Sequence, residues 1–263
     1  MNPTVFLRLD QIEFFNENGF LALDALTTQE EVAWMRDIYD RLFQERAGRE
    51  VGDQFDLAGT DEEGKEALLP QILNPVKYAP ELSEGLFRVN ALAVVQALLG
   101  PEVTMGGDHA ILKPARIGSE TPWHQDEAYW DEAVLHESVS IWIPLQEATL
   151  ENGCMWFLPG SHRFPVKPHH SLNNDPRIHA LQIDEEIDKS QAVACPIPAG
   201  GCTIHHCRTY HYTGPNRSDG DRRALILGGG IPGVALDVPR DFYWNKIKTT
   251  ARDERAKAAS ESQ

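Results

Sequence analysis

Apolar residues in the first hundred positions recur at intervals of three and four, which is the spacing of one face of an α-helix. Val32, Met35 and Leu42 form the clearest such stripe. Thr28 and Glu31 have the spacing of a capping box and mark the start of that helix. The first hundred residues are therefore predicted to be mainly helical. The predicted helices run from Asp10, as N-cap, to about Asn18 and Gly19, from 28 to about 46, and from 81 to 99, with a short strand at 20–26.

From Val103 onward the pattern changes to short apolar stretches interrupted by Gly, Pro and Asn. The run that begins at Arg222 alternates and becomes increasingly apolar, as a strand does when it enters a core. Many short strands separated by turn residues are typical of a β-sandwich or a β-barrel. The predicted strands cover about 103–113, 123–129, 138–146, 154–158, 193–197, 202–206, 209–212 and 222–231.

Three segments lack clear periodicity. Residues 47–70 are rich in Gly, Asp and Glu, which predicts a mobile surface loop that could border an active site. Residues 160–192 are too long and too polar for a turn, so we expect an insertion that could lie over the mouth of a barrel. After Lys246 the chain is charged and Ala-rich, which predicts a terminal helix or a frayed tail.

Length and charge narrow the class of protein. The 263 residues suit one domain spanning 1–263, because a single core can grow to roughly 250 residues. The formal net charge of −16 argues against nucleic acid as a partner, since phosphate binding requires a basic surface. No apolar run approaches the roughly 20 residues needed to span a bilayer, so no membrane partner is expected. The sequence does not indicate an oligomeric state.

Cysteine usage bears on the compartment. The four cysteines form no Cys-x-x-Cys pair, and the first residues lack the basic-then-apolar pattern of a secretory signal. These features predict a cytoplasmic protein with reduced thiols.

Candidate chemistry begins at His124-Gln125-Asp126. Along an extended strand, residues two apart project from the same face, so His124 and Asp126 present an imidazole and a carboxylate side by side. Two histidines and one carboxylate on one face of a metal form the ligand set of non-haem Fe(II) oxygenases. A third ligand must therefore come from elsewhere in the chain, and the candidates are His205, His206 and His211.

Strand geometry alone does not select the third ligand. His205 and His211 could share a face of an uninterrupted strand, whereas His206 would face the other way. A similar choice arises downstream, where Arg222 and Arg223 point to opposite faces of a strand. Either arginine could bind a carboxylate co-substrate through two parallel hydrogen bonds.

The order of motifs resembles the phytanoyl-CoA dioxygenase family of Fe(II)/2-oxoglutarate oxygenases over about residues 10–232. The matching blocks are His124-Gln125-Asp126, Glu151-Asn152-Gly153-Cys154 with Pro159-Gly160-Ser161-His162-Arg163, and His211 through Gly214-Pro215-Asn216 to Arg222. The resemblance implies a mainly β protein with flanking helices. It places a double-stranded β-helix core (a jelly-roll, cupin-like) at about 101–232, with the helices of about 1–100 packed on one sheet and a charged tail at the end.

The resemblance also assigns the site. It implies His124, Asp126 and His211 as metal ligands and Arg222 as the residue that holds 2-oxoglutarate. Four further residues fall where relatives line the co-substrate: Thr213, Trp142, Gln71 and His109. At Gln71 relatives carry a lysine, and this departure puts that contact in doubt, although an amide can still donate a hydrogen bond.

The implied activity is that of a dioxygenase that uses Fe(II), 2-oxoglutarate and O2 to oxidise a C–H bond of a small molecule, with release of succinate and CO2. Asp126 favours hydroxylation, since halogenating relatives replace this carboxylate with a small residue. Trp123, Tyr129 and Trp130 flank the ligand pair and suit an apolar or ring-bearing substrate.

Two other functions are compatible with parts of the pattern. A cupin-like protein could hold a metal and bind a small molecule without turnover, and it would not require Arg222. A hydrolase or isomerase on a similar barrel would use His205 and His206 as additional ligands. A coenzyme A thioester as substrate would require more basic residues near the mouth than the modest cluster of Arg163, Lys167, His169 and His170.

Overall fold

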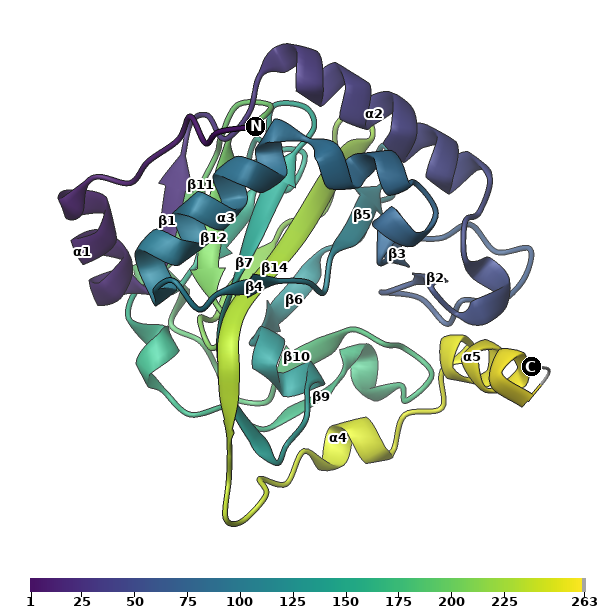
Figure 1. Ribbon diagram of the computed structural model, residues 1–263. Coiled ribbons are helices and arrows are strands. Elements are labelled where there is room, and N and C mark those ends of the chain that lie inside the picture. Colours follow the sequence, from purple (N-terminus) through teal and green to yellow (C-terminus); the bar gives the residue numbers. More distant parts are fainter. Residues whose placement is uncertain (262–263) are drawn as a thin grey trace.

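The computed structural model describes residues 1–261, and its core is a sandwich of two antiparallel sheets (Figure 1). The larger sheet has eight strands and the smaller has four. In order across the larger sheet lie β1 (Phe20–Leu23), β12 (Cys202–His206), β7 (Val134–Pro144), β14 (Arg222–Ala235), β5 (His109–Lys113), β3 (Pro70–Leu73) and β2 (Gln54–Asp56), with β4 (Thr104–Met105) paired to β14.

The smaller sheet lies opposite and carries two of the candidate metal ligands. Its strands, in order, are β11 (Val193–Cys195), β8 (Met155–Phe157), β13 (His211–Thr213) and β6 (Thr121–His124). A separate hairpin is formed by β9 (His169–Ser171) and β10 (Leu181–Ile183). This is the jelly-roll, cupin-like architecture that the motif order implied.

Helices cover the outer face of the larger sheet (Figure 1). The apolar stripe of α2, which includes Met35 and Leu42, belongs to one buried cluster with Val94 of α3 and with Ile141 and Leu225 of the sheet. The predicted packing of the N-terminal helices on one sheet is therefore confirmed. The α-helices are α1 (Leu9–Asn18), α2 (Gln29–Gln44), α3 (Leu86–Leu99), α4 (Tyr243–Lys246) and α5 (Ala251–Glu261).

Short 3-10 helices connect many of these elements. They cover Arg49–Val51, Pro75–Lys77, Pro80–Glu84, Asp126–Tyr129, Ser161–Arg163, Leu172–Asn174 and Lys189–Gln191.

The interior between the sheets is apolar at one end. Trp142 and Ile226 of the larger sheet belong to a buried cluster with Met155 and Phe157 of the smaller one. Phe20 stacks on Phe157 with ring centroids 4.7 Å apart. This cluster joins the sheets, and the candidate site lies beside it.

Helix starts differ from the predictions at two places. Arg8, not Asp10, is the N-cap of α1, and the backbone N–H of Arg8 donates a hydrogen bond to Oε1 of Gln11 (2.9 Å). Asp10 lies in the first turn, where a carboxylate interacts favourably with the helix dipole. The helix predicted from residue 81 begins at Leu86, because Pro80–Glu84 forms a 3-10 helix that ends at Gly85.

The prediction that all of 47–70 is a mobile surface loop is wrong. Residues 54–58 are buried, and β2 pairs with β3 inside this range. The Asp56 carboxylate accepts hydrogen bonds from the backbone N–H groups of Ala58, Leu68 and Leu69, which satisfies a turn that has few ladder bonds. A polar sequence was therefore compatible with burial, because one side chain replaces the missing backbone partners.

Most predicted strands are present, with altered limits. The segment 103–113 divides into β4 and β5, and 123–129 ends as a strand at His124, where a 3-10 helix begins. The short strands β2, β3, β9 and β10 were not predicted. The tail after Lys246 forms α5, which is its predicted helical alternative, and α4 directly precedes it. All four cysteines are buried and unpaired.

No helix within residues 1–261 combines the length and apolar character needed to cross a bilayer.

Glu31 joins two helices and offers a test of the helical layer. Its carboxylate accepts hydrogen bonds from the backbone N–H groups of Leu86 (2.5 Å) and Phe87 (2.8 Å) at the start of α3. Replacing Glu31→Ala should lower the free energy of unfolding by about 2 kcal/mol, since these donors lose their cap. The measurement is urea-induced unfolding.

Glu30→Ala is the matched control, because Glu30 lies in the same first turn of α2 and does not reach α3. It should cost less than about 1 kcal/mol, which is the range of a helix-dipole effect. Equal losses in the two variants would contradict the assigned role of Glu31.

Candidate active site

Two histidines from neighbouring strands of the smaller sheet form the base of the site. His124 of β6 and His211 of β13 are directly paired across the ladder, and their ring centroids are 4.1 Å apart. Asp126 follows Gln125, whose backbone is extended (φ −119°, ψ 133°), so Asp126 projects on the same side as His124. One ligand atom from each of His124, Asp126 and His211 lies within 4.8 Å of the other two.

Hydrogen bonds define the tautomers of both histidines. The Nδ1 atom of His124 lies 2.7 Å from the carbonyl oxygen of Pro122, and that of His211 lies 2.9 Å from the carbonyl oxygen of Thr209. A carbonyl can only accept, so each Nδ1 carries the proton and each Nε2 keeps its lone pair. Burial lowers the pKa of both histidines, so both are neutral.

The lone pairs therefore converge on one point. Nε2 of His211 lies 3.3 Å from Oδ1 of Asp126, and Nε2 of His124 lies 3.6 Å from the same oxygen. Three electron-rich atoms this close repel one another unless a cation lies between them. A site of two imidazole nitrogens and one carboxylate oxygen fits a divalent metal such as Fe(II).

The second oxygen of Asp126 is held by the opposite sheet. The Ser140 hydroxyl donates to Oδ2 (2.7 Å), and Nε2 of His205 lies 3.1 Å from the same atom. These bonds leave Oδ1 free to face the histidines. His205 therefore contacts the ligand Asp126 without belonging to the triad, and it helps to orient that carboxylate.

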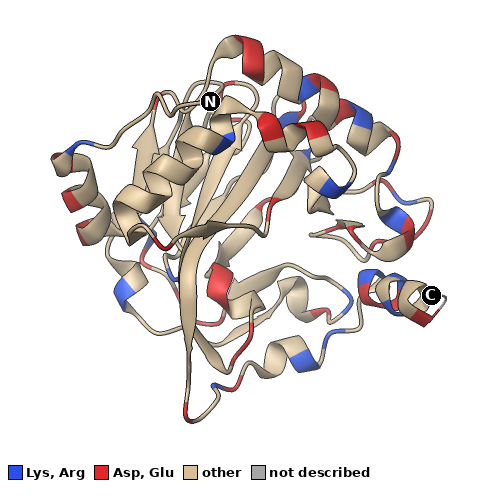
Figure 2. Cartoon of the chain, viewed as in Figure 1, with Lys and Arg blue, Asp and Glu red and all other residues tan. Residues whose placement is uncertain are grey.

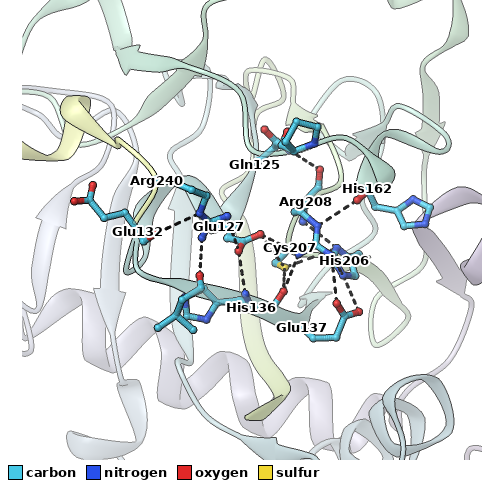
Figure 3. A network of polar contacts seen from close by, with 12 residues as sticks. Gln125, Glu127, Glu132, His136, Glu137, His162, His206, Cys207, Arg208 and Arg240 are labelled. Atoms are coloured by element: carbon cyan, nitrogen blue, oxygen red, sulfur yellow. Dashed lines mark hydrogen bonds and ion pairs between the residues drawn. The ribbon is translucent and has the colours of Figure 1, made fainter. Parts of the chain in front are cut away.

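Gln125 and Glu127, the residues on either side of Asp126, belong to a buried polar network (Figure 3). Gln125 and Glu127 are both 0% exposed. The side-chain amide of Gln125 donates to the carbonyl oxygen of Arg208 (2.9 Å). Because Gln125 is extended, its anchored side chain faces away from those of His124 and Asp126. Glu127 lies in the 3-10 helix that follows, and its anchoring holds the backbone after Asp126.

Glu127 is neutralised by two arginines from distant parts of the chain (Figure 3). Arg208 approaches its carboxylate to 3.2 Å and Arg240 to 3.0 Å, while the backbone N–H of His136 donates to Oε1 (3.0 Å). A buried carboxylate is tolerated only when it is paired in this way. Arg240 follows β14, so the C-terminal segment braces the back of the metal site.

Arg222 lies inside the sandwich at the start of β14. It is 1% exposed, and its guanidinium carbon lies 5.2 Å from the centre of the Trp142 ring. Its Nε and Nη1 have no hydrogen-bond partner within residues 1–261. Burial lowers the pKa of Arg222 to about 10, so the side chain remains charged at neutral pH. A buried guanidinium with unpaired N–H groups is costly, and an anion placed against it removes that cost.

One cavity of about 670 Å³ contains both features. Arg223, the competing arginine, points outward and pairs with Asp40. The cavity is lined by the three candidate metal ligands together with all five residues predicted for the co-substrate, namely Arg222, Thr213, Trp142, Gln71 and His109.

The comparisons with known proteins agree with this geometry. The family model described as Phytanoyl-CoA dioxygenase (PhyH) matches residues 15–224. The chain belongs to the phytanoyl-CoA dioxygenase family.

Among solved structures, this member of the phytanoyl-CoA dioxygenase family is similar to EvdO2 from Micromonospora carbonacea var. aurantiaca, in a complex with 2-oxoglutarate. The two are 38% identical, the match covers 93% of this chain and 99% of that chain, and the TM-score is 0.78.

Two curated relatives have other substrates in their names. A probable alpha-ketoglutarate-dependent hypophosphite dioxygenase from Stutzerimonas stutzeri is 30% identical over 164 residues, which are 61% of this chain and 57% of that protein. The peroxisomal phytanoyl-CoA dioxygenase of Bos taurus is 26% identical over 231 residues, which are 83% of this chain and 67% of that protein.

Not every residue near the motif belongs to the pocket of this family member. Tyr129 and Trp130 line the cavity, whereas Trp123 stacks on Tyr212 outside it, with centroids 5.5 Å apart. Trp123 is therefore a core residue and not part of the aromatic wall of the cavity, because in β6 it faces away from its neighbour His124.

Three residues that line the cavity were not predicted individually: Leu57, His179 and Arg252. They come from the 47–70 segment, the 160–192 insertion and the C-terminal tail. The predictions that the first two segments could border the active site gave the only sequence signal for them, and none pointed to Arg252.

Ser140 provides a test of the metal site. Replacing Ser140→Ala removes one of the two bonds to Oδ2 of Asp126, so affinity for a divalent metal should fall by roughly ten-fold. Calorimetric titration with Co(II) measures this change. Ser138→Ala is the matched control, since Ser138 lies two residues earlier in β7 and its hydroxyl has no partner within residues 1–261. Equal affinities for Co(II) in the two variants would count against the role of Ser140.

Proposed function

We propose that this protein is an Fe(II)- and 2-oxoglutarate-dependent dioxygenase that hydroxylates a C–H bond of a small organic molecule and releases succinate and CO2. The observation that carries the proposal is the presence, in one cavity, of a converging His-Asp-His triad and a buried arginine with unpaired N–H groups. The first requires a cation and the second requires an anion. A metal-chelating dicarboxylate satisfies both.

Each side chain then has a defined task. His124, Asp126 and His211 would hold Fe(II), a ligand set that leaves the metal able to bind the co-substrate as well. Arg222 binds the distal carboxylate of 2-oxoglutarate through two parallel hydrogen bonds. When bound, iron and 2-oxoglutarate supply the oxidising chemistry, in which O2 is reduced while the keto acid is decarboxylated and the substrate is oxidised.

The remaining predicted residues line the co-substrate. The Thr213 hydroxyl lies 2.9 Å from the hydroxyl of Thr121, and its O–H can rotate to donate to a carboxylate oxygen of the co-substrate instead. Trp142 packs against the Arg222 guanidinium and excludes water from it. Gln71 and His109 lie on the adjacent strands β3 and β5, and Gln71 takes the place of the lysine expected from relatives.

Hydroxylation is the reaction that the ligand set favours. Asp126 would be the third protein ligand of the metal, whereas halogenating relatives have a small residue at this position. The basic cluster of Arg163, Lys167, His169 and His170 does not line the cavity, and Lys167 pairs with Glu185 (2.9 Å). A free small molecule therefore fits better than a coenzyme A thioester.

Co-substrate binding and turnover test the proposal together. Under anaerobic conditions, Fe(II) and 2-oxoglutarate should produce a metal-to-ligand absorption band, and O2 should then give succinate. Arg222→Ala should weaken 2-oxoglutarate binding on the order of 100-fold, because truncating one partner of a buried charge pair costs about 2–5 kcal/mol. The band intensity at increasing 2-oxoglutarate concentration measures this loss.

The control is Arg223→Ala, the next residue of β14, which removes the same charge from the surface side of the strand. It should leave the dissociation constant for 2-oxoglutarate within about two-fold of the unmodified protein. Absence of the absorption band in the unmodified protein would refute the proposal, as would equal affinities in the two variants.

A further inference from the structure

Arg252 reaches the cavity from outside the region that the family model matches. It belongs to α5, whereas the match ends at residue 224. Figure 1 shows α5 beside the segment that precedes β2, and α5 contacts the 3-10 helix Arg49–Val51. The Nε atom of Arg252 donates to the carbonyl oxygen of Gly52 (3.1 Å), which fixes the guanidinium at the cavity wall.

The Arg252 guanidinium retains free hydrogen-bonding capacity. Its carbon lies 5.1 Å from the centre of the Phe55 ring, and its Nη1 pairs with the half-exposed Asp253 (3.1 Å). Within residues 1–261 no hydrogen bond involves its Nη2. An arginine that is stacked on an aromatic ring and has a free N–H edge is pre-organised to bind a planar anion.

Aromatic groups continue the wall beside Arg252. Phe55 contacts the His179 ring edge to face (5.0 Å), and His179 stacks on Tyr129 (5.6 Å). Burial, with Lys248 and Arg252 nearby, lowers the pKa of His179 well below its usual value, so this ring is neutral. Its buried Nδ1 has no partner within residues 1–261. The Nζ atom of Lys248 lies over the Tyr129 ring, 4.8 Å from the ring centre.

Among the charges that line the cavity, Arg252 is the one that the metal and the co-substrate do not neutralise. The charged lining side chains are Asp126, Arg222 and Arg252. Once Fe(II) and the dianionic co-substrate are bound, their charges and those of Asp126 and Arg222 cancel. Arg252 is offset only by the half-exposed Asp253, at Nη1, and its Nη2 edge remains free within residues 1–261. The chain as a whole has a net charge of −16, with acidic and basic residues distributed along it (Figure 2), so a preference of the cavity for anions depends on local cations such as Arg252.

We propose that Arg252 is a specificity-determining residue that pairs with an anionic group of the substrate, a carboxylate or a phosphate ester. This inference rests on the proposed oxygenase function and adds the substrate class. The anionic group would lie against the wall that His179 and Tyr129 form, and the C–H bond to be oxidised would extend from there toward the metal triad. A neutral hydrocarbon would leave the Nη2 edge of Arg252 without an acceptor at the cavity wall.

Small aromatic probes test the inference on the complete protein loaded with Fe(II) and saturating 2-oxoglutarate under anaerobic conditions. The probes are benzoate, phenyl phosphate and the neutral benzamide, and their binding is followed by the change in the metal-to-ligand absorption band. We expect the preferred anion to bind at least ten-fold more tightly than benzamide. Tighter binding of benzoate indicates a carboxylate substrate, and tighter binding of phenyl phosphate indicates a phosphate ester.

Variants assign the preference to Arg252. Arg252→Gln should reduce affinity for the preferred anion by about 10- to 100-fold, to the level of benzamide, and Arg252→Lys should restore part of it because the charge is kept. Lys257→Gln is the matched control, since it removes the same charge from the exposed side of α5 and should change nothing.

Three results would overturn the inference: equal binding of anions and benzamide, no binding of any probe, or an anion preference that persists in Arg252→Gln. The absorption band of the complex before any probe is added tests the proposed function separately. A normal band without an anion preference would therefore reject the role of Arg252 alone.

Discussion

Mutual repulsion of three lone pairs is the constraint on which the site depends. His124 and His211 each donate an Nδ1 proton to a backbone carbonyl, so their Nε2 atoms face Oδ1 of Asp126 without a proton between them. Such an arrangement is stable only around a cation. The antiparallel pairing of β6 with β13 brings the histidines together, and Ser140 and His205 from the opposite sheet orient the carboxylate. Both sheets are thus required for one metal site.

A second unmet electrostatic demand lies in the same cavity. Arg222 is buried between the sheets, stacked near Trp142 and short of hydrogen-bond acceptors. A cation site and a buried guanidinium with space between them are complementary to a dianion that chelates metal at one end. The chain therefore provides a metal-binding triad for one end of a keto-dicarboxylate and the Arg222 guanidinium for the other. Family membership and the likeness to EvdO2 agree with this chemistry.

The outer part of the cavity has a different origin from its base. The metal ligands lie on core strands, whereas Leu57, His179 and Arg252 come from the segments that connect or follow the core. Connecting segments vary more readily than core strands, and enzymes commonly place binding residues on them. The relatives named for hypophosphite and for phytanoyl-CoA share the family and differ in what their names say they oxidise. In this protein the segment after β14 also contacts the base of the cavity, because Arg240 pairs with Glu127, the residue next to Asp126.

The sequence by itself determined the helices on one side, most of the core strands and the motif order that selects the metal triad and Arg222. These depend on local periodicity and on short spacings such as His124 to Asp126, which can be read directly from the linear sequence. Only the tertiary structure decided that Trp123 faces away from the pocket and that Arg252 lines the cavity. It also decided that residues 54–58 are buried, with the Asp56 carboxylate accepting hydrogen bonds from nearby backbone N–H groups. Such contacts join residues far apart in the chain, and no local pattern of apolar and polar positions records which distant surfaces meet.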